Sequence, residues 1–61
     1  MTEFETIKNA LSRVRADLEI YDFPTGKSIF IPINSLMAEG IIQLELEFDV
    51  NGKLVDTFTW D

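Results

Sequence analysis

Apolar residues in the first part of the chain recur at helical spacing. They fall three or four positions apart, at Phe4, Ile7, Leu11, Val14 and Leu18. This spacing places them along one side of a helix. Thr2 and Glu5 stand three residues apart, as in a capping box, where hydroxyl and carboxylate each accept a backbone amide. The pattern predicts an amphipathic helix over residues 3–16 that covers one face of a sheet.

The next apolar segments have the length and composition of strands. Residues 18–23 and 28–33 flank Pro24-Thr25-Gly26, which is a turn sequence. A four-residue loop from Phe23 to Gly26 places similar side chains opposite one another. The predicted pairs are Asp22 with Lys27, Ile20 with Ile29, and Leu18 with Ile31.

A connector is predicted after this hairpin. Pro32 has no amide hydrogen to donate, so the second strand ends there or lies at a sheet edge. Ser35 is suited to cap a single turn through residues 36–38, which Gly40 would end.

The clearest strand is predicted at residues 41–50. Apolar positions (Ile42, Leu44, Leu46, Phe48 and Val50) alternate there with polar ones (Gln43, Glu45, Glu47 and Asp49). This alternation gives one apolar and one acidic face, as in an antiparallel strand with one side in water. Residues 53–60 form its partner across Asn51-Gly52.

Two turns give this second hairpin different registers. A two-residue Asn-Gly turn would pair Glu45 with Phe58 and Gln43 with Trp60, which places large apolar groups on the acidic face. A type I turn over residues 49–52, followed by a bulge, shifts the pairing by one residue. It pairs Ile42 with Trp60, Leu44 with Phe58, Phe48 with Leu54, and Asp49 with Lys53. We predict this bulged hairpin, because it gathers the apolar side chains on one face.

One residue fits this register poorly. Asp56 falls on the apolar face beside Leu46. We expect it at a margin of the sheet, or bonded to Arg13 or Arg15 of the helix. The element order predicts an α+β fold in which an N-terminal helix packs on a four-stranded, mainly antiparallel sheet of two β-hairpins. Residues 1–61 form a single small domain, because 61 residues leave no room for a second.

Composition removes most routes to catalysis. The chain has no cysteine and no histidine, so disulfides, thiolate metal sites and the commonest general base are absent. Lys27 and Ser28 are neighbours in a predicted strand and point to opposite faces, so they form no dyad. Residues 49–52 lack the further oxygen ligands of a calcium loop. We expect no enzyme activity, no catalytic residue, no cofactor and no metal site.

The net charge of −6 restricts the choice of partners. Nucleic acids and anionic membranes bind basic surfaces, so direct binding to either is disfavoured. No apolar stretch approaches the roughly 20 residues of a membrane span. The acidic N-terminal residues do not resemble a signal peptide. We expect a cytoplasmic protein.

Two groups of side chains are candidates for binding a protein partner. Glu45, Glu47 and Asp49 form an acidic row, although charged outer faces also serve solubility. Tyr21, Phe23 and Phe30 lie on the face of the first hairpin opposite its isoleucines. Aromatic surface of this size often marks an interface, unless residues 34–40 or Trp60 fold over it.

The leading hypothesis from the sequence is a non-catalytic protein-binding module that works as a homodimer. The dimer would use the aromatic face of residues 21–30 or an exposed sheet edge, because a core from 61 residues is thin. Such a protein would inhibit or regulate a larger protein, as a phage or mobile-element inhibitor does. One alternative is a nucleic-acid mimic whose acidic strand face blocks a basic site. Another is a structural subunit of a larger assembly.

Overall fold

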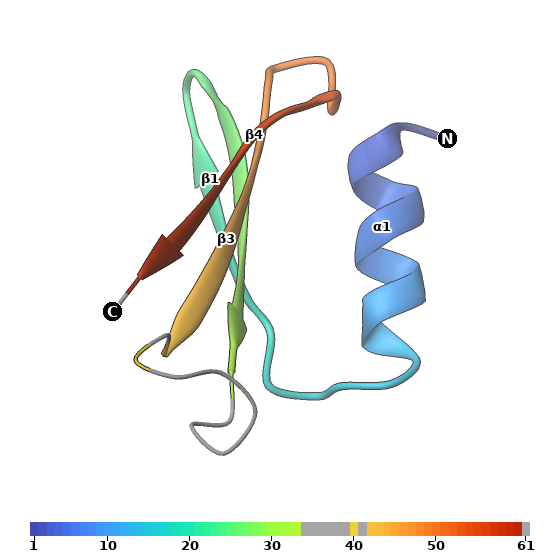
Figure 1. The fold of residues 1–61 in the computed structure, drawn as a ribbon. Coiled ribbons are helices and arrows are strands. Elements are labelled where there is room, and N and C mark those ends of the chain that lie inside the picture. Colours follow the sequence, from blue (N-terminus) through green and yellow to red (C-terminus); the bar gives the residue numbers. More distant parts are fainter. Residues whose placement is uncertain (34–39, 41, 61) are drawn as a thin grey trace.

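One helix and a four-stranded sheet make up the fold (Figure 1). The computed structural model describes residues 1–33, 40 and 42–60. The elements are α1 (Glu3–Ser12), β1 (Glu19–Phe23), β2 (Gly26–Pro32), β3 (Gln43–Phe48) and β4 (Leu54–Trp60). The strands are antiparallel in the order β1-β2-β3-β4, and α1 packs on one side of the sheet. The predicted α+β class is confirmed.

The start of α1 follows the sequence prediction and its end does not. Thr2 Oγ1 accepts the Glu5 amide at 3.2 Å, and Thr2 N donates to Glu5 Oε1 at 3.1 Å, which completes the capping box. The helix ends at Ser12 rather than at residue 16. Val14 is 77% exposed, so it does not continue the apolar stripe. Apolar spacing alone did not locate this helix end.

The core lies between α1 and the sheet. Four apolar side chains are buried there: Phe4, Ile29, Ile31 and Phe48. Phe4 and Phe48 meet edge to face, with ring centroids 5.1 Å apart. The helix start is also tied to the turn between β3 and β4, because Phe4 N donates to Gly52 O at 2.8 Å. A small core therefore holds the helix against one face of the sheet.

The register of the first hairpin is confirmed within the strands. Asp22 pairs with Lys27 and Ile20 with Ile29, and the Asp22 carboxylate lies 3.0 Å from the Lys27 ammonium. Phe23 and Gly26 form the last pair before the turn, so β2 begins two residues earlier than residue 28. Leu18 precedes β1 and has no strand partner, although it packs against the core.

The second hairpin follows the predicted register only beside its turn. Phe48 pairs with Leu54 as expected, and Asp49 N donates to Lys53 O at 2.9 Å. A further bulge, which was not predicted, then leaves Val55 without a partner residue. Beyond it the register changes, so two of the predicted pairs are wrong. Leu44 lies opposite Thr59 rather than Phe58, and Trp60 pairs with Gln43 rather than with Ile42.

The bulge also changes the place of Asp56. This residue lies opposite Glu47, not beside Leu46, and its Oδ1 accepts the Thr57 amide at 2.8 Å. The expected place at a margin of the sheet is confirmed, because β4 is an edge strand of the described sheet. The alternative, a bond to Arg13 or Arg15, is wrong, because the ion pairs of the described residues are Arg15–Asp17 and Lys27–Asp22. The extra residue rotates the strand, so that Asp56 leaves the apolar face.

One further predicted strand is shorter than expected, and one predicted turn lies outside the described residues. The predicted strand 41–50 is observed as Gln43–Phe48, and Val50 is an exposed turn residue. The predicted Ser35 cap and the turn through residues 36–38 fall outside the described residues. Across the part of the chain that the structure describes, no helix has the length and apolar character needed to cross a membrane.

Candidate functional site

The side of the sheet away from α1 is here called the open face. No described helix or strand covers it (Figure 1). Strand alternation and register place two kinds of side chain on it. The aromatic members are Tyr21, Phe23, Phe30, Phe58 and Trp60. The acidic members are Glu19, Glu45, Glu47 and Asp56.

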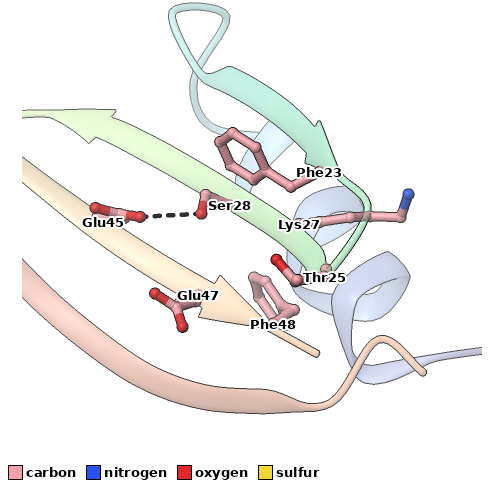
Figure 2. A pocket seen from close by; sticks show the side chains of 8 residues that line it. Phe23, Thr25, Lys27, Ser28, Glu45, Glu47 and Phe48 are labelled. Atoms are coloured by element: carbon pink, nitrogen blue, oxygen red, sulfur yellow. Dashed lines mark hydrogen bonds between the residues drawn. The ribbon is translucent and has the colours of Figure 1, made fainter. Parts of the chain in front are cut away.

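Glu45 occupies the middle of the open face. Its side chain is anchored from both neighbouring strands, because Ser28 Oγ donates to Oε2 at 2.9 Å and Trp60 Nε1 donates to Oε1 at 3.2 Å. Figure 2 shows the bond from Ser28. Glu45 is only 9% exposed, and both of its carboxylate oxygens accept a hydrogen bond. These bonds fix the position of a buried carboxylate, which would otherwise be costly to desolvate.

The aromatic side chains of the first hairpin form a connected group. The Tyr21 ring meets Phe30 edge to face at 5.2 Å and stacks on Phe23 at 6.3 Å between centroids. Tyr21 also donates its hydroxyl to Glu19 Oε2 at 3.0 Å, and this bond raises the pKa of the phenol. Tyr21 and Phe23 are still about half exposed. Much of this ordered aromatic surface is therefore in water.

The open face carries negative charge without compensation by side chains of its own. The five basic residues of the chain are Lys8, Arg13, Arg15, Lys27 and Lys53. All five are described, and none of them lies on the open face. Lys27 points to the helix side, where its ammonium lies 5.6 Å from the centroid of the Phe4 ring. The four acids of the open face therefore attract positive charge.

A pocket of about 160 Å³ lies at the β1–β2 turn end of the open face. Its lining includes the Phe23 ring, the Ser28 hydroxyl and the carboxylates of Glu45 and Glu47 (Figure 2). Thr25, Gly26, Lys27 and Phe48 also line it. The Lys27 ammonium is directed to Asp22 and the Phe4 ring on the helix side. The pocket is smaller than the roughly 300–1,000 Å³ of most small-molecule sites. Its size suits one side-chain tip.

The structure brings five of the six predicted binding residues together. The two predicted groups are parts of one surface, since Tyr21, Phe23 and Phe30 share the open face with Glu45 and Glu47. Asp49 follows β3 and is used by the turn. Its Oδ1 accepts the amides of residues 51 and 53 at 2.9 and 3.0 Å.

Several members of the open face were missed from the sequence. Asp56, Phe58 and Trp60 were assigned to the apolar face through the wrong register, and Ser28 was considered only as a nucleophile. Asp56 was the residue of the sequence that could have indicated the correct register. Its poor fit in the apolar series of β4 indicates a bulge, and a bulge transfers Phe58 and Trp60 to the open face.

Other polar groups of the described residues serve the fold. No group of three or more acidic residues among residues 1–33, 40 and 42–60 is arranged to hold a metal ion. A hollow of about 500 Å³ lies between the helix start and the β3–β4 turn. Its lining includes Glu5, whose carboxylate accepts from Thr2, and Lys27, which pairs with Asp22.

Comparison with known proteins adds no assignment. No family model, no curated protein and no solved structure matches the chain. Its function must be inferred from the geometry and charge of the open face.

Proposed function

We propose that this chain is a small non-catalytic protein-binding module whose open face binds a basic surface of a partner protein. The observation that carries the proposal is the combination of half-exposed aromatic rings with four carboxylates on one face of the sheet. Aromatic anchors supply most of the energy in protein interfaces, and complementary charge selects the partner.

The pocket supports a basic side chain as the anchor. An ammonium or guanidinium group entering it would lie beside the Phe23 ring and the Glu47 carboxylate. A cation over an aromatic ring gains about 0.5–2 kcal/mol, more when water is excluded. Arginine fits best, because its flat guanidinium group can stack on a ring while it donates to a carboxylate.

The same charge disfavours a homodimer that joins two open faces. Such a dimer would bring the four acids of one copy against the same four acids of the other. Like charges brought together across an interface raise the free energy of binding by on the order of several kcal/mol. A homodimer built in this way is therefore a weaker proposal than a basic partner.

The nucleic-acid mimic remains the second candidate. It is supported by the acidic row of β3 and by the net charge of −6. However, the Glu45 carboxylate is buried and engaged by Ser28 and Trp60, which leaves fewer charges to imitate phosphates. Both candidates block or regulate a larger protein by occupying its basic surface. They differ in how much the aromatic rings contribute.

A defined probe tests the proposal. Trp60 is the only tryptophan and lies on the open face, so its emission reports binding there. We expect an arginine tripeptide to change this emission with saturation. The matched citrulline tripeptide, which is neutral but nearly isosteric, should have little effect.

Substitutions identify the surface that binds the probe. Phe23→Ala and Glu47→Gln should each weaken arginine binding about threefold to thirtyfold, as expected for the loss of about 0.6–2 kcal/mol. Asp17→Asn removes the same charge from the connection between α1 and β1 and should leave binding nearly unchanged. Equal binding by all three variants would refute the open face as the site. If Phe23→Ala has no effect and binding collapses between low and moderate salt, the mimic is favoured.

A further inference from the structure

We propose that a second copy of this chain pairs with the outer edge of β4, antiparallel to it, so that the two sheets become one. This interface joins the sheets at their edges, so that the open faces of both copies, including the pocket beside Phe23, stay uncovered except for the β4 side chains at the seam. The two-fold axis would pass beside Phe58, perpendicular to the sheet. Both helices would then lie on one side and both open faces on the other.

The backbone of β4 presents unused hydrogen-bonding groups along this edge. Within the described residues β4 has a strand neighbour on one side only. Trp60 O accepts from Ile42 N at 2.8 Å, so Trp60 directs its backbone toward the sheet. The Thr57 amide instead bonds to the carboxylate of its neighbour Asp56. Because strand residues alternate, Thr57 and Thr59 direct their amides and carbonyls away from β3.

The side chains of this segment favour strand pairing. Residues 56–60 contain one charge, two threonines and two aromatic rings, and neither lysine nor proline. Natural edge strands usually carry charged residues, especially lysine, or prolines, which prevent pairing with a strand of another chain. The opposite edge, β1, has Glu19 and Asp22 among its five residues. Pairing two copies along β1 would therefore collect twice as many carboxylates as pairing along β4.

The segment is also complementary to itself. With Phe58 opposite Phe58 of the second copy, each Thr57 faces a Thr59 and can exchange two backbone hydrogen bonds with it. Asp56 then faces Trp60 of the other copy, so no carboxylate opposes its own counterpart. Phe58 and Trp60, now 40% and 50% exposed, would each gain a cross-strand neighbour.

Two costs shape the expected behaviour. Asp56 must release the Thr57 amide, and two chains of charge −6 repel each other. Salt screens this repulsion, so dimerisation should strengthen with ionic strength. Binding of a basic partner to the open face should weaken under the same change. The opposite salt responses distinguish the failure of one proposal from the failure of the other.

Sedimentation equilibrium of two variants at residue 59 tests the interface. Thr59→Pro removes an outward amide that β3 does not use, and an edge strand tolerates proline at such a position. Thr59→Val keeps this amide and the β-branched shape. We expect the wild type and Thr59→Val to dimerise, and Thr59→Pro to dissociate at least tenfold more readily. Circular dichroism must show the same folded signal for both variants.

A cysteine cross-link gives a second readout that does not depend on proline. The chain has no cysteine, so Phe58→Cys introduces a unique thiol. In a non-hydrogen-bonded antiparallel pair the two Cα atoms lie about 4.5 Å apart, within reach of a disulfide. We expect rapid formation of a disulfide dimer by Phe58→Cys and slow formation by Phe23→Cys on the far edge. A wild type that stays monomeric at millimolar concentration in high salt would overturn the proposal. So would a dimer that Thr59→Pro does not weaken and in which Phe58→Cys does not cross-link.

Discussion

Glu45 joins three strands through its own side chain. It lies on β3 and accepts hydrogen bonds from Ser28 on β2 and from Trp60 on β4. A buried carboxylate with fewer donors would be destabilising. The same bonds orient the Trp60 ring on the open face. One residue therefore links the stability of the sheet to the shape of the proposed binding surface.

Removal of the Ser28 hydroxyl tests this role. Ser28→Ala leaves Glu45 buried with one donor fewer, and we expect the free energy of unfolding in urea to fall by about 1.5–3 kcal/mol. Thr25→Ala removes a hydroxyl from an exposed turn residue and should change it by no more than about 0.5 kcal/mol. Equal losses in the two variants would show that the bond to Glu45 contributes nothing specific.

Position 26 requires glycine, both for its backbone conformation and for its close approach to the backbone of β3. Its φ is +148°, and a Cβ atom there would overlap the carbonyl oxygen of Phe48. We expect Gly26→Ala to destabilise the protein by more than about 2 kcal/mol, because positive φ and steric overlap add. Gly40→Ala is the control, since Gly40 has φ +73° but a Cβ atom there would have no atom of the described residues within 4 Å. It should cost only about 1–2 kcal/mol in thermal or urea unfolding.

At the scale of the elements, local signals predicted the structure where they were complete. The capping box located the start of α1, and opposite charges with matched isoleucines located the pairing of β1 with β2. The end of α1 was missed because apolar spacing continues to Val14, while the exposed side chain gains nothing from burial. No residue type forced the helix to extend or to stop.

The register of β4 depends on the bulge at Val55, and no short sequence motif predicts this bulge. A single extra residue, Val55, changes which face each following side chain occupies. The acidic and aromatic candidates were therefore identified, but Phe58 and Trp60 were not assigned to them. The joint surface could be recognised only once both hairpins were placed in one sheet.

The capping box of α1 should make stability depend on pH. The hydrogen bond from the Thr2 backbone, followed by that from its side chain, lowers the pKa of Glu5 in the folded protein. The unfolded chain then binds the proton more readily, so this contribution is present above the ordinary pKa of Glu5 and is lost as pH falls through the lowered value. We expect Glu5→Gln to lose stability at neutral pH and to lose less than the wild type on acidification below about pH 4. Urea unfolding across this range measures both. Parallel pH curves would contradict the capping role.

The N-cap of α1 can also be tested by a substitution that changes no titratable group. Thr2→Ala removes the side chain that accepts the Glu5 amide. We expect a loss of about 1 kcal/mol in unfolding free energy, whereas Thr2→Ser should retain most of it. Indistinguishable urea midpoints for alanine and serine at this position would contradict the cap.

At the scale of the whole molecule, α1 covers one sheet face, and no helix or strand of the described residues covers the other. Phe4→Ala should therefore cost far more than Phe58→Ala. Phe4 is buried against Phe48, and its truncation is expected to cost about 3–5 kcal/mol, a large part of the stability of so small a chain. Phe58 is 40% exposed on the open face and should cost less than half as much. Similar losses in thermal unfolding would mean that Phe58 is as well covered as the core.

The chain would then present two surfaces with different physical behaviour. The open face attracts positive charge and should release its partner as salt rises, whereas the β4 edge joins equal charges and should pair more tightly. A dimer formed along β4 would place two open faces side by side. A partner with two basic sites could then bind both.

The most direct test is a map of NMR amide and aromatic shifts during titration with the arginine tripeptide at low salt. We expect saturable shifts at Phe23, Ser28 and Glu47 around the pocket, extending to Trp60, and little change along Glu3–Ser12. The citrulline tripeptide should leave the spectrum almost unchanged. Shifts confined to α1, or equal shifts with both peptides, would contradict a binding surface formed by the aromatic and acidic side chains of the open face.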